Sequence, residues 1–228
     1  MQFLKFFIFF LTFHFFGTTD FEKAEKLYQQ QKWDQAKVLF QECLKENPKD
    51  FKSIEYLGDI AGHQKNWDEA IKYYKTLKIQ FPKTANYFYK YGGSLGMKAK
   101  TVNKFKALGM ISDIEKSFLM ATKLDPKHIE SRWALVMFYI QIPGIVGGSE
   151  AKAQKYSNEL MALSKVDGYL SQGYIDEYFE RYSNAEQDYS KAHEIGNSKT
   201  TFQKLYNLYL NKIKDSVKAK KLKEQFEK

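Results

Sequence analysis

The sequence WDQA at residues 33–36 returns as WDEA at residues 67–70, thirty-four positions further along the chain. The same offset relates Phe40 to Tyr74, and a proline follows each motif at the same distance. A fixed period of this length, with small, aromatic and proline residues at constant positions, is typical of stacked helix pairs. Because one such pair cannot bury its apolar face alone, neighbouring pairs must stack to form a core.

The composition is that of a folded helical protein. The 228 residues suffice for one large or two small domains, and 43% of them are hydrophobic. Only four prolines and 13 glycines are present, which argues against an all-β or low-complexity chain. The single cysteine, Cys43, excludes an intrachain disulfide and a multi-cysteine metal site. We expect no cofactor.

The formal net charge is +9, and we interpret it as lysines scattered over the polar faces of helices. An anionic partner, such as nucleic acid or a membrane surface, is the alternative interpretation. Few arginines are available for bidentate phosphate contacts, so nucleic acid is disfavoured.

Residues 1–19 have the pattern of a secretory signal peptide. Lys5 precedes an apolar run over residues 6–16, and the small residues 17–19 suit a cleavage site. The run is too short to span a bilayer as a helix, and no cysteine is present for lipid attachment. We therefore expect export, to the periplasm of a Gram-negative bacterium. An uncleaved N-terminal anchor is the alternative, and it is the only membrane contact that we expect.

From Asp20 onward, apolar residues recur at helical spacing. We predict helices at about 20–31, 34–46, 51–64 and 67–80, and prolines stop the second helix of each pair. The predicted helix pairs occupy about 20–50, 51–84, 85–128, 129–165, 166–199 and 200–228. In the fourth pair the helices are at about 129–141 and 150–164. The lysine-rich segment 212–228 is predicted to be a solvated capping helix.

Two insertions interrupt the period. Pro126 lies 44 residues after Pro82, so ten residues are inserted between the helices of the third pair, around 99–109. The fourth pair contains the loop 142–149 at the corresponding turn. The fifth pair regains the regular spacing, with Gly173 and Tyr189 at repeat positions.

The chain resembles the tetratricopeptide repeat family over nearly all of residues 20–228. The second pair has each element of the family pattern: Leu57-Gly58, Ala70, Tyr74 and Pro82. The insertion, the Asp-Pro helix end and the PGIVGG loop are similar to those of some bacterial tetratricopeptide proteins. The resemblance implies a right-handed all-α solenoid of about six antiparallel helix pairs. It implies no enzymatic activity.

The loop 142–149 and the preceding insertion are the first candidate site. Gly147 and Gly148 lead to Ser149 at a helix start, where free backbone N–H groups can hold an anion. The insertion adds four lysines on the same edge: Lys98, Lys100, Lys104 and Lys106. An anion or an acidic peptide would fit such a composite site. The alternative is an ordinary turn, in which the glycines allow positive φ and Ser149 caps the helix.

The groove lined by the first helix of each pair is the second candidate site. Aromatic, methionine and acidic side chains there would suit a peptide, although each aromatic could instead pack between helices. We obtain these positions by aligning the first helix of each pair with the first helix of the second pair. They are Tyr28, Glu55, Asp59, His63, Tyr89, Met97, Trp133, Met137, Tyr174, Glu177 and Tyr178. The lysine–asparagine clamp of chaperone-binding relatives is not evident at these positions.

We expect neither a metal site nor a catalytic site. His63, His128 and His193 lie 65 residues apart, which is not a multiple of 34, so they should face different directions. Cys43 occupies a position expected to be buried, and no motif fixes a carboxylate beside a catalytic partner. The sequence therefore predicts a non-enzymatic adaptor that binds a protein or peptide. The alternative is a module for an acidic polysaccharide, a lipid headgroup or nucleic acid.

Overall fold

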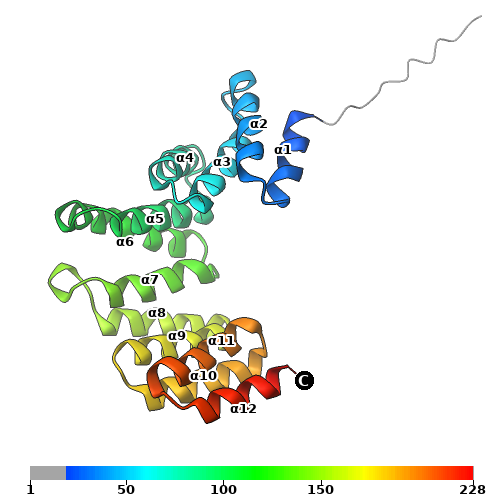
Figure 1. The fold of residues 1–228 in the computed structure, drawn as a ribbon. Helices are drawn as coiled ribbons and strands as arrows, with labels where there is room; N and C mark the ends of the chain where they lie inside the picture. Colours follow the sequence, from blue (N-terminus) through cyan, green and yellow to red (C-terminus); the bar gives the residue numbers. More distant parts are fainter. Residues whose placement is uncertain (1–18, 228) are drawn as a thin grey trace, which may run out of the picture. The chain divides into compact units, whose positions relative to one another are not determined.

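The computed structural model describes residues 19–227, and this part of the chain contains twelve α-helices and no strand (Figure 1). The all-α fold class is confirmed. The predicted signal peptide lies outside the described residues, except for Thr19. The helices, with a 3-10 turn (η1) and a π-turn (η2), are α1 (Asp20–Gln29), α2 (Trp33–Glu46), α3 (Phe51–His63), α4 (Trp67–Gln80), α5 (Ala85–Ala99), α6 (Lys104–Leu124), α7 (Ile129–Gln141), η1 (Gly144–Val146), α8 (Glu150–Leu163), α9 (Lys165–Tyr178), α10 (Tyr182–Gly196), α11 (Lys199–Leu208), η2 (Tyr209–Ile213) and α12 (Ser216–Phe226).

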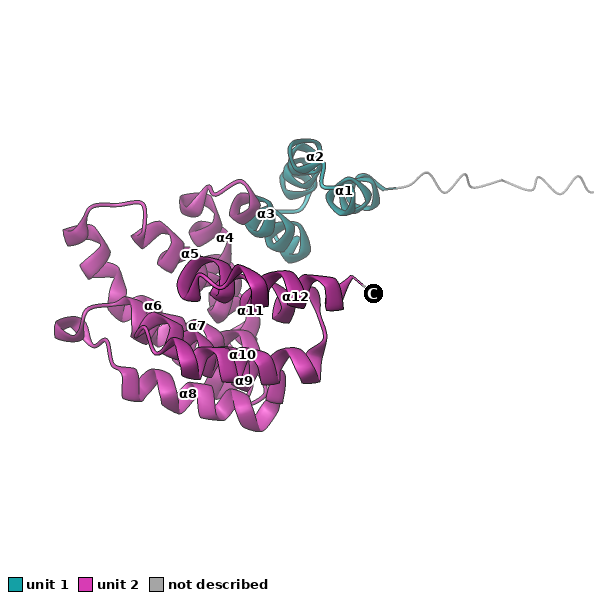
Figure 2. Cartoon of the chain, turned by 60° about the horizontal axis from the view of Figure 1, so that its bottom comes forward, with its two compact units in different colours: residues 1–60 teal, residues 61–228 magenta. Residues whose placement is uncertain are grey.

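The chain divides into two compact units, residues 1–60 and 61–228, and the boundary falls within α3 (Figure 2). Among residues 19–227, no helix combines the length and the apolar character needed to cross a bilayer.

The first unit is held together by aromatic packing. Phe40 of α2 is fully buried and stacks on Tyr56 of α3, with 4.7 Å between ring centroids. The hydroxyl of Tyr56 donates a hydrogen bond to Glu25 of α1 (2.9 Å). Burial, followed by this carboxylate, raises the pKa of Tyr56 to about 12. Cys43 is half-buried rather than buried, so the expectation for this residue is wrong: it lies at the border of the packed face of α2.

In the second unit, each helix from α4 to α12 contacts the next, and the first helices of successive pairs also contact one another, α5 with α7, α7 with α9, and α9 with α11. The first helices therefore share one face, as helix-pair stacking requires. In the second unit, α4 and α6 end two residues before Pro82 and Pro126, as the prolines predict. The last pair is covered by α12, which buries Ala219 and Leu222 and exposes its lysines.

Glycines allow the two helices within a pair to approach closely. A Cβ atom added at Gly173 of α9 would lie 2.6 Å from the ring of Tyr189 on α10. One added at Gly92 of α5 would lie 2.9 Å from Cβ of Ser117 and 3.0 Å from the Phe118 ring on α6. Real Cβ atoms do not come this close to their neighbours, so both positions require glycine.

The ten-residue insertion is not a basic loop, which corrects the sequence-based prediction. Only residues 100–103 lie between α5 and α6, and α6 is 21 residues long. The side chain of Asn103 accepts a hydrogen bond from the backbone N–H of Lys106 (3.0 Å) and so caps the helix. The residues after Asn103 are mostly good helix formers, so the inserted sequence lengthens the helices instead of forming a loop.

Candidate peptide-binding surface

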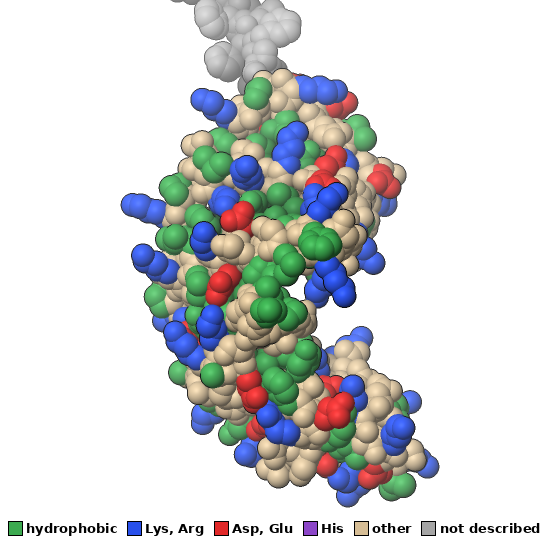
Figure 3. All heavy atoms as spheres, turned by 90° about the vertical axis from the view of Figure 1, so that its left-hand side faces the viewer, with side chains coloured by type: hydrophobic (Ala, Val, Ile, Leu, Met, Phe, Trp, Pro, Cys, Tyr) green, Lys and Arg blue, Asp and Glu red, His purple; other side chains and the backbone are tan. Residues whose placement is uncertain are grey.

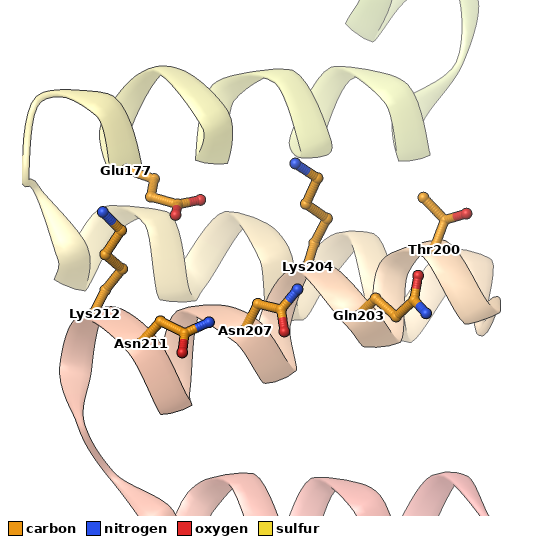
Figure 4. A pocket seen from close by; sticks show the side chains of 7 residues that line it. All are labelled: Glu177, Thr200, Gln203, Lys204, Asn207, Asn211 and Lys212. Carbon is orange, nitrogen blue, oxygen red and sulfur yellow. The ribbon is translucent and has the colours of Figure 1, made fainter. Parts of the chain in front are cut away.

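An open hollow of about 360 Å³ lies between α9 and α11. We call it the α9–α11 hollow. Its lining residues are almost all polar, and they are Glu177, Thr200, Gln203, Lys204, Asn207, Asn211 and Lys212 (Figure 4).

The spacing of residues along α11 explains how the hollow is built. Gln203, Asn207 and Asn211 follow one another at intervals of four residues, so their amides form a row along one helical face. The π-turn after α11 continues this row, and it also brings Lys212 to the rim. In Figure 4 the two asparagines lie between Lys204 and Lys212, and both lysines extend toward α9.

Neighbouring side chains hold the α9 side of the hollow in place. Glu177 accepts a hydrogen bond from the hydroxyl of the buried Tyr189 (2.9 Å), and burial together with Glu177 raises the pKa of that tyrosine. The hydroxyl of Tyr174 accepts a hydrogen bond from Gln141 (3.0 Å), and the ammonium of Lys204 lies 5.5 Å from the centre of the Tyr174 ring.

A second hollow of about 260 Å³ adjoins the first and shares Glu177, Lys204 and Lys212 with it. Tyr174 and Tyr178 add aromatic surface there, and the side chain of Tyr178 is half exposed. The structure therefore brings three of the predicted groove residues, Tyr174, Glu177 and Tyr178, to one place.

The chemistry of the hollow suits a polypeptide. Each amide can donate and accept hydrogen bonds, as a peptide backbone requires, and the lysines can bind a carboxylate. Within residues 19–227, neither Lys204 nor Lys212 forms an ion pair with a carboxylate.

The other predicted groove residues differ in their environments. His63, Met97 and Met137 are exposed. Tyr28 is half-buried and packs edge-on against Trp33 and Tyr56, and burial raises its pKa. These contacts are those of a side chain that packs between helices.

Tyr89 and Trp133 also pack between helices. Tyr89 lies against Phe118 and His128, and burial raises its pKa. The indole N–H of Trp133 donates to Asp167 (2.8 Å). Transfer of the repeat phase did not distinguish exposed side chains from packed ones.

The loop 142–149, which we call the glycine loop, is a turn whose backbone N–H groups have acceptors in the loop itself and in α7. The N–H groups of Gly147, Gly148 and Ser149 donate to the carbonyls of Gly144, Pro143 and Tyr139, and so the expectation that they are free is wrong. Gly147 has φ +103°, and a Cβ atom on Gly148 would lie 2.0 Å from the Ile142 carbonyl oxygen. Both glycines are thus explained by the turn alone.

Three of the four lysines predicted to accompany this loop are exposed, and the fourth is paired. Lys98 forms an ion pair with Asp68 of α4. Lys100 lies in the turn after α5, and Lys104 and Lys106 lie in the first turn of α6. The α5–α6 and α7–α8 turns are at the same end of the second unit in Figures 1 and 2.

Two histidines have structural roles. His128 caps α7 by accepting a hydrogen bond from the Ser131 N–H (3.1 Å), and His193 lies 3.1 Å from the Thr201 hydroxyl. In the described part of the chain, no group of three or more potential metal ligands occurs.

Sequence reasoning missed the lysine and amide residues of the hollow because the last pair departs most from the repeat pattern. A signal was present: Thr200, Gln203, Lys204, Asn207 and Asn211 follow the spacing i, i+3, i+4, i+7, i+11. A polar stripe with side-chain amides at every helical turn is distinguishable from a generic charged face.

Together the helix pairs and their shared face define a helical-repeat protein. The tetratricopeptide repeat family model matches residues 27–90. Comparison with curated protein sequences gives no match.

Solved structures extend the likeness over most of the chain. TTC0263, a thermophilic tetratricopeptide protein of Thermus thermophilus, is 18% identical, with a TM-score of 0.67 over 84% of this chain and 97% of that chain. PilW, described as a type IV pilus biogenesis factor, is 14% identical, with a TM-score of 0.67 over 90% of each chain. YrrB, described as having an unusual peptide-binding site, is 15% identical, with a TM-score of 0.55 over 80% of this chain and 87% of that chain.

This protein is similar to tetratricopeptide repeat proteins. Its sequence matches the family over residues 27–90, and the structural likeness extends the fold to the helices beyond them. At these identities the solved structures bear on fold and not on partner.

Proposed function

We propose that the protein is a non-enzymatic adaptor that binds a peptide segment of a protein partner in the α9–α11 hollow. Its fold belongs to a class that generally serves protein–protein interaction. The observation that carries the proposal is the row of amides at Gln203, Asn207 and Asn211, whose two asparagines lie between Lys204 and Lys212 (Figure 4), lysines that form no ion pair within residues 19–227.

The partner segment is extended and carries a carboxylate, on an acidic side chain or at its C-terminus. Amides spaced by one helical turn can bind backbone N–H and C=O groups, while the lysines attract the negative charge. Tyr174 and Tyr178 in the adjoining hollow offer a contact for an apolar side chain of the same segment.

The proposal includes export to the periplasm, supported by Lys5 and the apolar run over residues 6–16. N-terminal sequencing of the protein recovered from cell fractions tests this part. Recovery of the chain beginning at Met1 in the cytoplasmic fraction would contradict it.

A peptide array tests the hollow. Dodecapeptides of random sequence, each in free-acid and amidated form, are probed with the full chain and with Lys204→Gln/Lys212→Gln. We expect acidic or free-acid peptides to bind, and the double variant to bind them at least about tenfold more weakly, because two charge-assisted contacts are lost.

Lys220→Gln/Lys221→Gln removes the same charge from α12, outside the hollow, and serves as the matched control. Asn207→Ala should weaken binding without changing net charge. Equal losses in the two double variants, or peptide binding unaffected by Asn207→Ala, would exclude the hollow as the binding site.

A further inference from the structure

The positive charge of this protein is concentrated in one stretch of sequence. Residues 70–112 contain nine lysines and no aspartate or glutamate, which equals the net charge of +9 of the whole chain. The remaining residues contain 27 basic and 27 acidic side chains. The interpretation of scattered lysines is therefore incorrect, because the charge belongs to α4, α5 and the start of α6.

This stretch ends in an unusual cluster of exposed apolar side chains and lysines. Phe105 and Ile145 are 88% and 95% exposed, more than any other large hydrophobic residue in the described part of the chain. They lie in the first turn of α6 and in η1, at the end of the second unit where both turns lie (Figure 1). We call the following residues the basic edge: Lys100, Lys104, Phe105, Lys106, Leu108 and Ile145.

The electrostatics of the basic edge are unfavourable for the isolated fold. Asn103 begins α6, whose first turn contains Lys104 and Lys106 and no acidic residue. Acidic residues are preferred at this end of a helix, because its backbone N–H groups carry partial positive charge. Positive potential from the lysines and from the helix therefore adds up at one place.

Three carboxylates on the helices of the second unit have partners other than the lysines of the basic edge. Asp68 pairs with Lys98, and Glu150 pairs with Arg181. Glu115 accepts a hydrogen bond from the Tyr139 hydroxyl (2.6 Å). Within residues 19–227, Lys100, Lys104 and Lys106 form no ion pair.

Figure 3 faces this end of the molecule, and hydrophobic side chains occupy the middle of the view, with lysines and arginines on both sides and several acidic side chains among them. Protruding apolar groups with flanking cations match the interface of an anionic bilayer, which offers acyl chains beneath a negatively charged surface. Nucleic acid fits less well, since residues 70–112 contain no arginine and the apolar groups protrude rather than line a groove.

We propose that the basic edge binds the surface of an anionic lipid bilayer, with Phe105 and Ile145 entering the interfacial region. This surface is distinct from the α9–α11 hollow, so the protein could hold a peptide partner at a membrane. The proposed membrane contact does not depend on residues 1–19, for which an uncleaved anchor is the alternative to a signal peptide.

A local probe is needed, because the apolar run at residues 6–16 could itself bind vesicles. In the full chain, Phe105→Trp places an indole at the basic edge, and quenching by lipids brominated on their acyl chains reports its insertion. The unsubstituted chain, with Trp33, Trp67 and Trp133, gives the background. We expect additional quenching with vesicles containing phosphatidylglycerol and none with phosphatidylcholine alone.

Val217→Trp is the matched control, because Val217 is 77% exposed on α12 and lies outside the basic edge. It should show no additional quenching. Adding Lys100→Gln, Lys104→Gln and Lys106→Gln to the probe variant should weaken its binding about a hundredfold at low salt, from about fivefold per lysine. Lys220→Gln/Lys221→Gln/Lys223→Gln, with the same charge change, should have little effect.

Three results would overturn the proposal. The first is no additional quenching of Phe105→Trp by anionic vesicles, and the second is equal quenching of Val217→Trp. The third is displacement of the bound chain by a single-stranded oligonucleotide that protects Phe105→Trp from aqueous iodide, since the basic edge would then be a nucleic-acid site.

Discussion

The helix pairs α5/α6 and α9/α10 have the same close contact and different helix lengths. In each pair a glycine of the first helix faces an aromatic ring of the second, Gly92 with Phe118 and Gly173 with Tyr189. Phe118 lies 14 positions after the first residue of α6, whereas Tyr189 lies seven positions after the first residue of α10. The second helix of the α5/α6 pair therefore begins two turns earlier. The packed contact is retained, and the additional turns carry Lys104, Phe105 and Lys106.

The shared contact can be broken by adding one methyl group. Gly173→Ala should lower the free energy of unfolding by about 2–3 kcal/mol, because the Tyr189 ring is fully buried and cannot move aside. Gly92→Ala should cost less, about 1–2 kcal/mol, since the clash is milder. Urea unfolding monitored by circular dichroism gives the comparison.

Gly93→Ala provides the control, because a Cβ atom on Gly93 meets nothing within 4 Å. It should raise stability by about 0.5–1 kcal/mol through helix propensity. If Gly93→Ala and Gly92→Ala behave alike, close approach is not the reason for glycine at position 92.

The tyrosine hydroxyl distinguishes the α9/α10 contact from its counterpart, which has phenylalanine. Tyr189→Phe removes the hydrogen bond to Glu177 and should cost about 1–2 kcal/mol at neutral pH. The pKa of Tyr189 is raised by burial and by Glu177, so its stabilising contribution is complete below pH 10. It is lost as pH rises further, because the unfolded tyrosine ionises first.

The difference in unfolding free energy between the native chain and Tyr189→Phe should therefore narrow above pH 10. Contributions from the other tyrosines cancel in this difference. If this difference in unfolding free energy widened as pH rises, the folded state would favour the ionised hydroxyl of Tyr189.

The extension of α6 depends on its own cap. Asn103→Ala should cost about 1 kcal/mol and accelerate amide hydrogen exchange over residues 104–108, while protection around Phe118 stays unchanged. Asn66→Ala at the start of α4 is a suitable reference. The hydrogen bond that the Asn66 side chain accepts from the Glu69 backbone N–H is longer, at 3.5 Å. Loss of protection throughout α6 would show that the extension and the packed contact unfold together.

The smallest stability effect concerns charge. Lys104→Glu should raise the free energy of unfolding by about 0.3–1 kcal/mol, since an acidic residue suits the first turn of a helix. The same substitution should weaken vesicle binding by the basic edge. Thermal unfolding and vesicle binding should give Lys104→Gln a stability and a vesicle affinity between those of the native chain and Lys104→Glu. A fall in stability with glutamate would contradict the helix-dipole argument.

Much of the fold could be predicted from the sequence. The repeat period placed α4 and α7 at their observed bounds, because a proline or a tight turn fixes each helix end locally. The period also placed Gly173 and Tyr189 at repeat positions, and the structure brings the two residues into close contact. It could not show that the insertion before Phe118 lengthens α6, because a count of inserted residues does not distinguish loop from helix.

The candidate site was harder to predict, since exposure depends on neighbouring helices. Tyr89 and Tyr178 were both predicted to line the groove, yet Tyr89 packs against two rings and Tyr178 is half exposed. Lys204 and Lys212 became recognisable only when α11 and the π-turn were placed beside α9. The hydrogen bonds within the glycine loop also required the backbone path.

The concentration of charge in residues 70–112 has a consequence for how this protein can evolve. Helix pairs in such a stack contact mainly their neighbours, and whole repeats are gained or lost as units of sequence. Exchange of the α5/α6 pair for an uncharged repeat would remove most of the net charge in a single event, while α9, α11 and their amide row would keep their immediate surroundings. Under the two proposals, affinity for an anionic surface and choice of partner would be separately heritable traits of one chain.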